Sequence, residues 1–422
     1  MPASRHDVVI VGAGQAGLAM SRCLSRRDID HIVVDRHDVA SSWTRQRWDS
    51  LRLLTPNWMT KLPDAPAFSG HPDGFAPAAE VAAYLRSYAS LVDAPVVSDC
   101  PVERIEPDIN GWRVLTPTGT LSARAVVLAV GPGSTPRRPA AASALAASTR
   151  TISALDYKNP GDVEDGGVLV VGASASGAQI ADELARAGRT VTLAVGEHVR
   201  AVRSYRGRDL YWWLDRTGLL DESTDEVDDL RRVRATPSFQ VVGSDDGRSV
   251  DLNALQSRGV CLTGRLVGAD GARAVFSGSL ANLCRSADLK LERLLDRFDA
   301  FAVEQGIADL TDPWRPQRTD VPAPLLELRG SALRTVIWAT GFEQAFPAID
   351  APVFDRRGRL MHDGGVVGTS GLYVLGLPFL RRRRSSFIAG AEDDAEAVAG
   401  RIRAHLDRWS VAWSPCTAAT NM

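Results

Sequence analysis

The hydrophobic pattern of the chain is a series of short apolar runs separated by amphipathic stretches. The runs are rich in Val and Ile and lie at residues 8–11, 31–34, 125–130, 168–171, 190–195, 335–338 and 372–376. Continuous apolar runs of this length are typical of strands buried on both faces of a parallel sheet. Stretches with helical spacing lie between them, notably at 15–27, 81–91, 280–303 and 390–409. This alternation predicts an α/β fold with parallel sheets.

Three regions depart from that alternation. Apolar and polar residues alternate at 102–105 and 112–115, which predicts an antiparallel insertion. Residues 41–75 are rich in Trp and Pro and show no clear period, so we expect a structured loop there. Residues 134–147 are rich in Pro and Ala and predict a connector at a domain boundary.

A glycine motif follows the first apolar run. Gly12, Gly14 and Gly17 have the spacing of a dinucleotide-binding turn, in which a strand ends and a helix begins. Asp35 ends the next predicted strand, where a carboxylate can accept hydrogen bonds from an adenosine ribose. The spacing alone is a weak signal, and the strand, helix and acid around it make it specific. The residues expected to bind this dinucleotide are Gly12, Gly14, Gln15, Ala16, Gly17, Asp35 and Arg36.

A second copy of the motif begins at Gly172, with Ser174 in place of the middle glycine and Gly177 in third place. Serine is small enough to let a pyrophosphate approach the backbone. The strand that follows ends at Val195 without an acid, and arginines come soon after it. An arginine in place of the acid indicates a 2′-phosphate, so we expect NADPH rather than NADH. The residues expected to bind it are Gly172, Ser174, Ser176, Gly177, Arg200, Arg203 and Arg206.

Two glycine motifs predict two dinucleotides, with FAD at the first site and a nicotinamide nucleotide at the second. The strands at 335–341 and 372–376 look like the missing pieces of the first domain. We therefore expect two Rossmann-like domains of the glutathione-reductase type. An FAD domain at 1–148 and 333–422 is interrupted by an NADPH domain at 149–332. In the second FAD segment the expected cofactor contacts are Thr340, Gly341 and Gly376.

Composition and charge narrow the classes of function. A chain of 422 residues has room for two or three domains with full-sized cores. The formal net charge is −2, which gives no sign of a nucleic-acid or acidic-lipid partner. No apolar stretch approaches the roughly 18 residues of a membrane span, and the first apolar run is too short for a signal peptide. We expect a cytoplasmic protein without a membrane partner.

Several kinds of reactive site are missing from the sequence. The five cysteines are scattered without a close pair, which argues against a disulfide framework, a zinc finger and the redox-active pair of a disulfide reductase. The seven histidines form no close metal-binding pair, so we expect no metal site. Neither the nucleophile elbow of α/β-hydrolases nor a phosphate-binding P-loop occurs.

Further motifs carry a family resemblance. They include Trp43 with Arg47-Trp48, Leu54-Thr55-Pro56-Asn57-Trp58, Asp73-Gly74-Phe75, Tyr205-Arg-Gly-Arg208-Asp209, Trp338-Ala-Thr-Gly341-Phe342 and Gly371-Leu-Tyr-Val-Leu-Gly376. With them the chain resembles flavin-dependent monooxygenases of the two-dinucleotide type over nearly its whole length. That class contains FAD- and NADPH-dependent N- and S-oxygenases and Baeyer–Villiger enzymes. Within it, the chain is most similar to bacterial flavoproteins described as NAD(P)/FAD-dependent oxidoreductases.

This resemblance implies the chemistry and the remaining site residues. Trp43, Arg47 and Thr55 are expected along the flavin, and Asn57 is expected as a donor near the reacting centre. NADPH would reduce FAD, and the reduced flavin would react with O₂ to a C4a-(hydro)peroxyflavin. That species would pass one oxygen atom to the nitrogen, sulfur or carbonyl group of a small-molecule substrate. The resemblance leaves a homodimer open as the assembly.

One departure from the family pattern keeps other functions open. Such monooxygenases carry an FxGxxxHxxxY/W fingerprint before the second glycine motif, whereas this chain has Ser153 at the histidine position and Tyr157 at the end. Without the histidine, an NAD(P)H oxidase or diaphorase-type reductase that hydroxylates nothing is one alternative. A flavin- or nucleotide-sensing regulatory protein is another, because some similar bacterial flavoproteins are linked to K⁺ transport.

Overall fold

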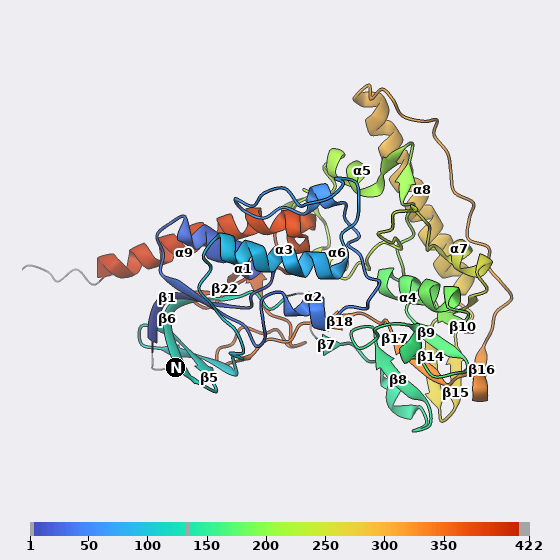
Figure 1. Ribbon diagram of the computed structural model, residues 1–422, viewed down its shortest axis with the longest axis horizontal. Coiled ribbons are helices and arrows are strands. Elements are labelled where there is room, and N and C mark those ends of the chain that lie inside the picture. Colours follow the sequence, from blue (N-terminus) through green and yellow to red (C-terminus); the bar gives the residue numbers. More distant parts are fainter. Residues whose placement is uncertain (1–3, 132, 134, 413–422) are drawn as a thin grey trace, which may run out of the picture.

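The computed structural model describes residues 4–131, 133 and 135–412, and it contains two large sheets built around parallel strands, with helices packed on them (Figure 1). The parallel strands of the first sheet are, in spatial order, β22 (Leu372–Val374), β6 (Gly119–Leu128), β1 (Ser4–Val11), β2 (His31–Val34) and β3 (Val96–Val97). Those of the second sheet are β13 (Cys261–Thr263), β10 (Val191–Ala194), β9 (Val168–Val171), β17 (Thr335–Trp338) and β8 (Arg150–Ser153). The expected α/β class with two Rossmann-like domains is confirmed.

The helices predicted from apolar spacing and from the second glycine motif are present as α1, α3, α4, α8 and α9, and α7 was not predicted. On the first sheet, α1 (Gln15–Ser25), α3 (Ala78–Leu91) and α9 (Ala391–Ala412) lie side by side. On the second sheet, the helices are α4 (Ala175–Arg186), α7 (Leu252–Ser257) and α8 (Leu280–Glu304). The predicted antiparallel insertion is β4 (Arg104–Asp108) with β5 (Gly111–Thr116), which continues into β6.

Strand β9 shows why the second sheet is apolar on both faces. Val168 and Val170 pack in one cluster with residues of α4, α7 and α8, while Leu169 and Val171 pack in another. That other cluster includes Phe276 and the antiparallel strands β14 (Leu266–Asp270), β15 (Arg273–Phe276) and β16 (Glu327–Arg329). Each side chain of the strand is therefore removed from water, as its unbroken apolar run predicts.

One strand lies in a different domain from the one predicted. The run at 335–341 was expected to complete the FAD domain, but β17 lies between β9 and β8 in the second sheet. An apolar run predicts burial in a parallel sheet without saying which sheet, and both were available. The run at 372–376 was assigned correctly, because β22 pairs with β6 of the first sheet.

The chain therefore leaves the first domain before the predicted boundary at residue 148 and returns to it after the predicted boundary at residue 332. The outgoing segment β7 (Thr135–Pro136) and the returning segment β18 (Phe342–Glu343) pair antiparallel, and Arg137 N donates to Gly341 O at 3.0 Å. We call residues 4–130 and 344–412 the first domain, and residues 139–340 the second domain. The second domain thus includes β17 and does not end at residue 332.

A long excursion of the second domain reaches the first. Residues 199–239 leave the sheet after β10 and return where Val199 and Phe239 form a parallel bridge. The excursion carries α5 (Leu210–Arg216) and α6 (Leu230–Arg234). Residues 381–384 of the first domain hold it, because Arg384 pairs with Asp215 at 2.9 Å and Asp221 at 2.7 Å. Arg383 pairs with Glu222 beside them.

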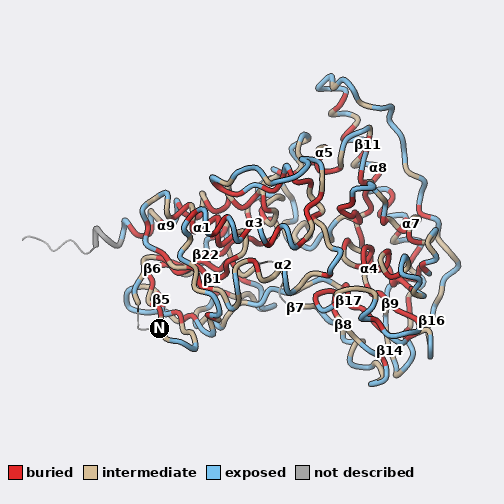
Figure 2. The backbone as a smooth tube through the Cα atoms, viewed as in Figure 1, coloured by how far each residue is buried: buried red, intermediate tan, exposed pale blue. Residues whose placement is uncertain are grey.

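Burial follows the same division (Figure 2). Buried residues gather in the two sheets and where the 199–239 excursion meets the first domain, while residues 306–326 run along the outside and are mostly exposed. Within the described part of the chain, no helix is both long enough and apolar enough to cross a membrane.

The ion pair between Arg383 and Glu222 predicts a charge-swap result. We expect Arg383→Glu to lower the Tm by about 2–4 °C, because it places two carboxylates together at a domain contact. The double variant Arg383→Glu with Glu222→Arg should recover most of that loss in thermal unfolding. Arg359→Glu, which breaks an ion pair with Asp355 inside one domain, is the control that Glu222→Arg should not rescue.

Candidate functional site

The first glycine loop (residues 12–17) is shaped by contacts of the chain with itself. Gly12 has a φ of +113°, and a Cβ there would overlap the carbonyl oxygen of Ala129 at the end of β6. A Cβ at Gly17 would overlap the carbonyl of Gly12, because α1 begins directly against the end of β1. These two glycines are therefore required by the fold itself.

Gly14 differs from its neighbours, because a Cβ there would meet no atom within 4 Å. It is the N-cap of α1, and no side chain caps that helix. The first amides of α1 therefore face open space with a positive dipole end, which suits a pyrophosphate. Gln15 at the first helical position is half-buried, and Ala16 touches the end of β22, since a Cβ at Gly376 would lie 2.9 Å from Ala16 Cβ.

Asp35 is fixed at the carboxyl end of β2. Its Oδ2 accepts from Ala13 N at 2.7 Å, and its Oδ1 accepts from His37 N at 2.9 Å. These bonds hold the carboxylate beside the first glycine loop and leave lone pairs for ribose hydroxyls. Arg36 next to it is exposed. Together, the loop and the acid fit the adenosine diphosphate half of FAD.

The second glycine loop (residues 172–177) repeats this geometry. Gly172 has a φ of +107°, its Cβ would overlap Ala339 O, and a Cβ at Gly177 would overlap Gly172 O. Ser174 is the N-cap of α4 but makes no capping hydrogen bond, so the first amides of that helix are free of a side-chain cap as well. Ser174 and Ser176 are both half-buried. The loop fits a second pyrophosphate.

Thr340 and Gly341 were expected to contact FAD, and the structure places them where the chain leaves β17 for the crossing back to the first domain. They follow Ala339, which lies under the second glycine loop just as Ala129 lies under the first. The Thr340 hydroxyl donates to the carbonyl of Arg137 on the other chain crossing. The physical reason is the position of β17, which carries these residues into the second domain.

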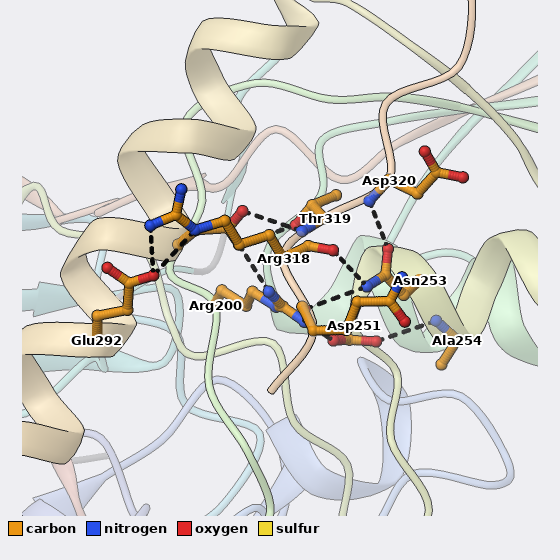
Figure 3. A network of polar contacts seen from close by, with 10 residues as sticks. Arg200, Asp251, Asn253, Ala254, Glu292, Arg318, Thr319 and Asp320 are labelled. Atoms are coloured by element: carbon orange, nitrogen blue, oxygen red, sulfur yellow. Dashed lines mark hydrogen bonds and ion pairs between the residues drawn. The ribbon is translucent and has the colours of Figure 1, made fainter. Parts of the chain in front are cut away.

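Arg200 is the centre of a buried polar network in the second domain (Figure 3). Its guanidinium donates to Asp251 at 2.7 Å, to Asp288 at 2.6 Å and to the carbonyl of Gln317 at 2.8 Å. The residue is only 3% exposed. Its charge is matched twice within the protein, which argues against the expected role in binding a 2′-phosphate.

The other two predicted arginines are also paired. Arg203 forms a two-pronged ion pair with Asp209, donates to Leu54 O at 2.8 Å and lies over the Phe75 ring at 4.6 Å. Arg206 pairs with Asp299 at 3.0 Å. Arg203 joins the excursion to the first domain, and Arg206 joins it to α8 and residue 311 of the second domain. Because both guanidinium groups are paired in this way, the geometry argues against a 2′-phosphate contact for them too.

The loop at 43–60 lies between the two domains and carries the residues expected along the flavin. The Arg47 guanidinium lies 5.2 Å from the centre of the Trp43 ring, and burial lowers its pKa. Within the described residues, Arg47 forms no ion pair with a carboxylate, which leaves its charge available to an anionic group. Thr55 is half-buried, and both Leu53 and Asn57 of the same loop are buried.

Asn57 is held firmly and has one atom without a partner. Its backbone N donates to Gly74 O at 2.9 Å, and its Nδ2 donates to His71 O at 3.0 Å. The acceptor Oδ1 is buried and has no hydrogen-bond partner. The donation to a carbonyl fixes which way the amide points. A donor was expected here, whereas the free atom is an acceptor, and a buried acceptor of this kind indicates a ligand donor.

Residues 153–158, which include the Ser153 and Tyr157 positions of the family fingerprint, help to join the two domains through hydrogen bonds. The Ser153 hydroxyl donates to Asp156 at 2.7 Å in a local turn, and the Tyr157 hydroxyl donates to Glu183 of α4 at 2.8 Å. Ser50 of the 43–60 loop donates to the other oxygen of Glu183 at 2.7 Å. Lys158 then donates to the carbonyls of Arg45 and Arg47, at 2.6 and 2.9 Å.

Sequence reasoning missed Lys158 and Glu183, and also Gln240, whose Nε2 donates to Ala173 O in the second glycine loop. Each is a single polar residue outside any motif, and its partner lies on a different element. Only the Tyr157 end of the fingerprint signalled that this stretch was special.

The described cysteines lie on separate elements. Cys23 is on α1, Cys100 follows β3, Cys261 is on β13 and Cys284 is on α8, and all four are free. No two of them share the loop beside the first glycine loop, where a redox-active pair would be needed. The fifth, Cys416, lies outside the described residues.

Comparison with known proteins agrees with this geometry. The sequence model of the pyridine nucleotide-disulphide oxidoreductase family matches residues 9–213. A CzcO-like oxidoreductase of Geobacillus kaustophilus is 30% identical over 405 residues, which cover 94% of this chain and 99% of that protein. A probable indole-3-pyruvate monooxygenase of Arabidopsis thaliana is 31% identical over 42% of this chain and 44% of that protein.

Solved structures of similar fold include flavin enzymes. A flavin-containing monooxygenase from Stenotrophomonas maltophilia has a TM-score of 0.67 at 20% identity and covers 96% of this chain and 99% of its own. An ornithine N-hydroxylase from Kutzneria has a TM-score of 0.63 at 17% identity and covers 95% of this chain and 100% of its own. At these identities the likeness concerns the fold. With the sequence match across its length and its two nucleotide loops, the chain belongs to the CzcO-like family of FAD- and NAD(P)-dependent oxidoreductases.

Proposed function

We propose that this protein is a monooxygenase that uses FAD and NAD(P)H to insert one oxygen atom from O₂ into a small molecule. The observation that carries the proposal is Asn57, whose buried Oδ1 has no partner within the described protein. Its loop contacts the second domain through Ser50 and the carbonyls of Arg45 and Arg47. An acceptor fixed between two nucleotide domains suits a reaction that brings both cofactors and a substrate together.

Each part of the site has a separate task in this proposal. When bound, FAD supplies the electron acceptor for the nicotinamide and the centre at which O₂ is activated. The two glycine loops bind the pyrophosphates, and Asp35 holds the adenosine ribose. Asn57 accepts a hydrogen bond from a donor on the bound cofactor or substrate. The buried side chains of Trp48 and Met59 add apolar surface to the same loop, which helps to exclude water.

The substrates that fit this chemistry share an electron pair or a carbonyl. A soft nucleophile such as an amine or a sulfide takes an electrophilic oxygen atom directly, without an acid–base triad. A ketone requires attack on its carbonyl carbon instead. The relatives described as an indole-3-pyruvate monooxygenase and an N-hydroxylase support oxygen transfer as the reaction type.

Ser153 favours a second candidate function, an NAD(P)H oxidase that releases peroxide. Its hydroxyl is closed into a local turn with Asp156, and its side chain is fully buried. It therefore cannot replace a histidine that would reach the nucleotide. Without that contact, we expect the reduced flavin protein to release H₂O₂ more readily before a substrate binds.

Oxygen balance separates the two functions. The FAD-loaded protein is reduced with NAD(P)H in the absence of air, then mixed with ¹⁸O₂ and an amine, a sulfide or a ketone. A monooxygenase yields an oxygenated product with one ¹⁸O atom and releases less peroxide than the nucleotide it oxidises. Stoichiometric H₂O₂ with all three substrate classes would overturn the proposal in favour of the oxidase. If neither NADH nor NADPH reduces the bound FAD, the flavin- or nucleotide-sensing regulatory protein is favoured instead.

Replacement of Asn57 tests the observation directly. Asn57→Leu keeps the volume and removes the acceptor, so we expect oxygenation or flavin reduction to slow about 10- to 100-fold. FAD content is measured alongside, so that the rates are compared per bound flavin. Single-turnover kinetics measure the rates, and Asn110→Ala, an exposed turn residue, is the control. A variant that oxygenates at the parent rate would remove Asn57 from the site.

The choice of nicotinamide nucleotide depends on the end of β10. Val195 occupies the position that Asp35 has in the first domain, and the exposed Glu197 follows two residues later. Glu197 lies 3.7 Å from Lys290 of α8. The arginines that predicted NADPH are paired elsewhere, and a carboxylate at this place repels a 2′-phosphate while it can accept from a free 2′-hydroxyl. We therefore propose that NADH is accepted at least as well as NADPH.

That preference predicts the effect of removing the charge. We expect Glu197→Gln to raise the ratio of kcat/KM for NADPH to kcat/KM for NADH about 3- to 10-fold, with flavin reduction as the readout. Glu164→Gln removes another exposed carboxylate, at the opposite end of the second sheet, and should leave the ratio unchanged. A parent enzyme that strongly prefers NADPH would contradict the proposal.

A further inference from the structure

The carbonyl after the first glycine accepts a hydrogen bond in both glycine loops, but the donor differs between them. In the first loop, the carbonyl of Ala13 accepts from the backbone N of Ala40, at 3.2 Å. In the second loop, the corresponding carbonyl of Ala173 accepts from the side chain of Gln240, whose Nε2 lies 2.5 Å away. This carbonyl thus accepts from the main chain in the first loop and from one side chain in the second.

Gln240 is placed with little freedom. It is 1% exposed, and its backbone N donates to Val199 O at 2.9 Å where the 199–239 excursion closes. Because the amide must present an N–H to the Ala173 carbonyl, its two ends cannot be exchanged. Its Oε1 is then a fixed acceptor beside the second glycine loop, and that atom is buried without a partner.

The segment that carries Gln240 is anchored on both sides. Gln179 of α4 donates through Nε2 to Val241 O at 2.9 Å, so two buried glutamines join this segment to the nucleotide-binding turn and its helix. Further along, a Cβ at Gly243 would overlap the carbonyl of Leu53. The segment at 239–244 therefore lies directly between the second glycine loop and the 43–60 loop.

A buried acceptor without a donor costs free energy in the unliganded protein, and a bound ligand can remove that cost. The nicotinamide nucleotide carries suitable donors in its ribose hydroxyls and its carboxamide N–H groups. Its pyrophosphate offers only acceptors, so it cannot satisfy Oε1. The free atom of Gln240 therefore suits the nucleoside part of the ligand.

We propose that Gln240 is a positioning residue of the nicotinamide site. Its Nε2 holds the second glycine loop in shape, and its Oε1 accepts a hydrogen bond from a sugar hydroxyl or the carboxamide of the bound nucleotide. This inference rests on the proposed binding of NAD(P)H at the second glycine loop. It does not depend on what the reduced protein does with oxygen.

Nucleotide binding tests the inference without turnover. Titration of the FAD-loaded protein with NAD⁺ and NADP⁺ by calorimetry gives the dissociation constants. We expect Gln240→Met, which is similar in length, to raise them about tenfold, while FAD content stays near that of the parent and the Tm falls by only a few degrees because Ala173 O loses a donor. Gln240→Glu keeps acceptor oxygens but places a charge beside the pyrophosphate loop, so it should weaken binding further. Gln256→Met, which removes a half-buried amide from α7, is the matched control.

Hydrogen exchange of the parent protein gives a second readout that needs no variant. Saturating NAD⁺ or NADP⁺ should slow amide exchange in residues 239–244 together with residues 172–178. Dissociation constants of folded Gln240→Met within twofold of the parent would overturn the inference, and so would unchanged exchange at 239–244. A parent that binds neither nucleotide would overturn both this inference and the proposed function. Normal binding with peroxide as the sole product would overturn the monooxygenase proposal alone.

Discussion

The whole architecture depends on one steric constraint, which is that a helix starts directly against the end of the strand before it. At Gly17 and Gly177 any side chain would overlap the carbonyl of the loop's own first glycine. Only with hydrogen at these positions can α1 and α4 come close enough for their first amides to converge on one point. The close contact between helix and strand thus also creates a site suited to phosphate. This site is formed in the absence of a ligand.

The same constraint appears twice and gives the two domains their likeness. In each, an alanine at the end of the neighbouring strand lies under the first glycine, Ala129 in the first domain and Ala339 in the second. The two domains differ in the residues that surround the glycine loops. An acid follows the second strand in one domain and a valine in the other, and the loop carbonyl is held by backbone in one and by Gln240 in the other. Specific chemistry is therefore carried by the surroundings of the loops.

Sequence alone predicted what depends on local spacing. The glycine loops, Asp35 and the strand–helix alternation follow from contacts between residues close in the chain or from burial on both faces of a sheet. The partner sheet of β17 could not be predicted, because an apolar strand fits either domain equally well. The arginines were misleading for a related reason, since the aspartates that pair with Arg200 lie far along the chain, at positions 251 and 288. Asn57 was predicted as a site residue through family resemblance, and its unpaired oxygen could be seen only in the structure.

The antiparallel pairing of β7 with β18 has a consequence for how such a protein could have arisen. The chain leaves the first domain and returns to it at neighbouring points, so the two crossings need no more space than a hairpin. A complete folded unit can be spliced into a surface turn of another without breaking the sheet of its host. The arrangement suits an ancestral single-nucleotide protein that acquired a copy of itself as a guest.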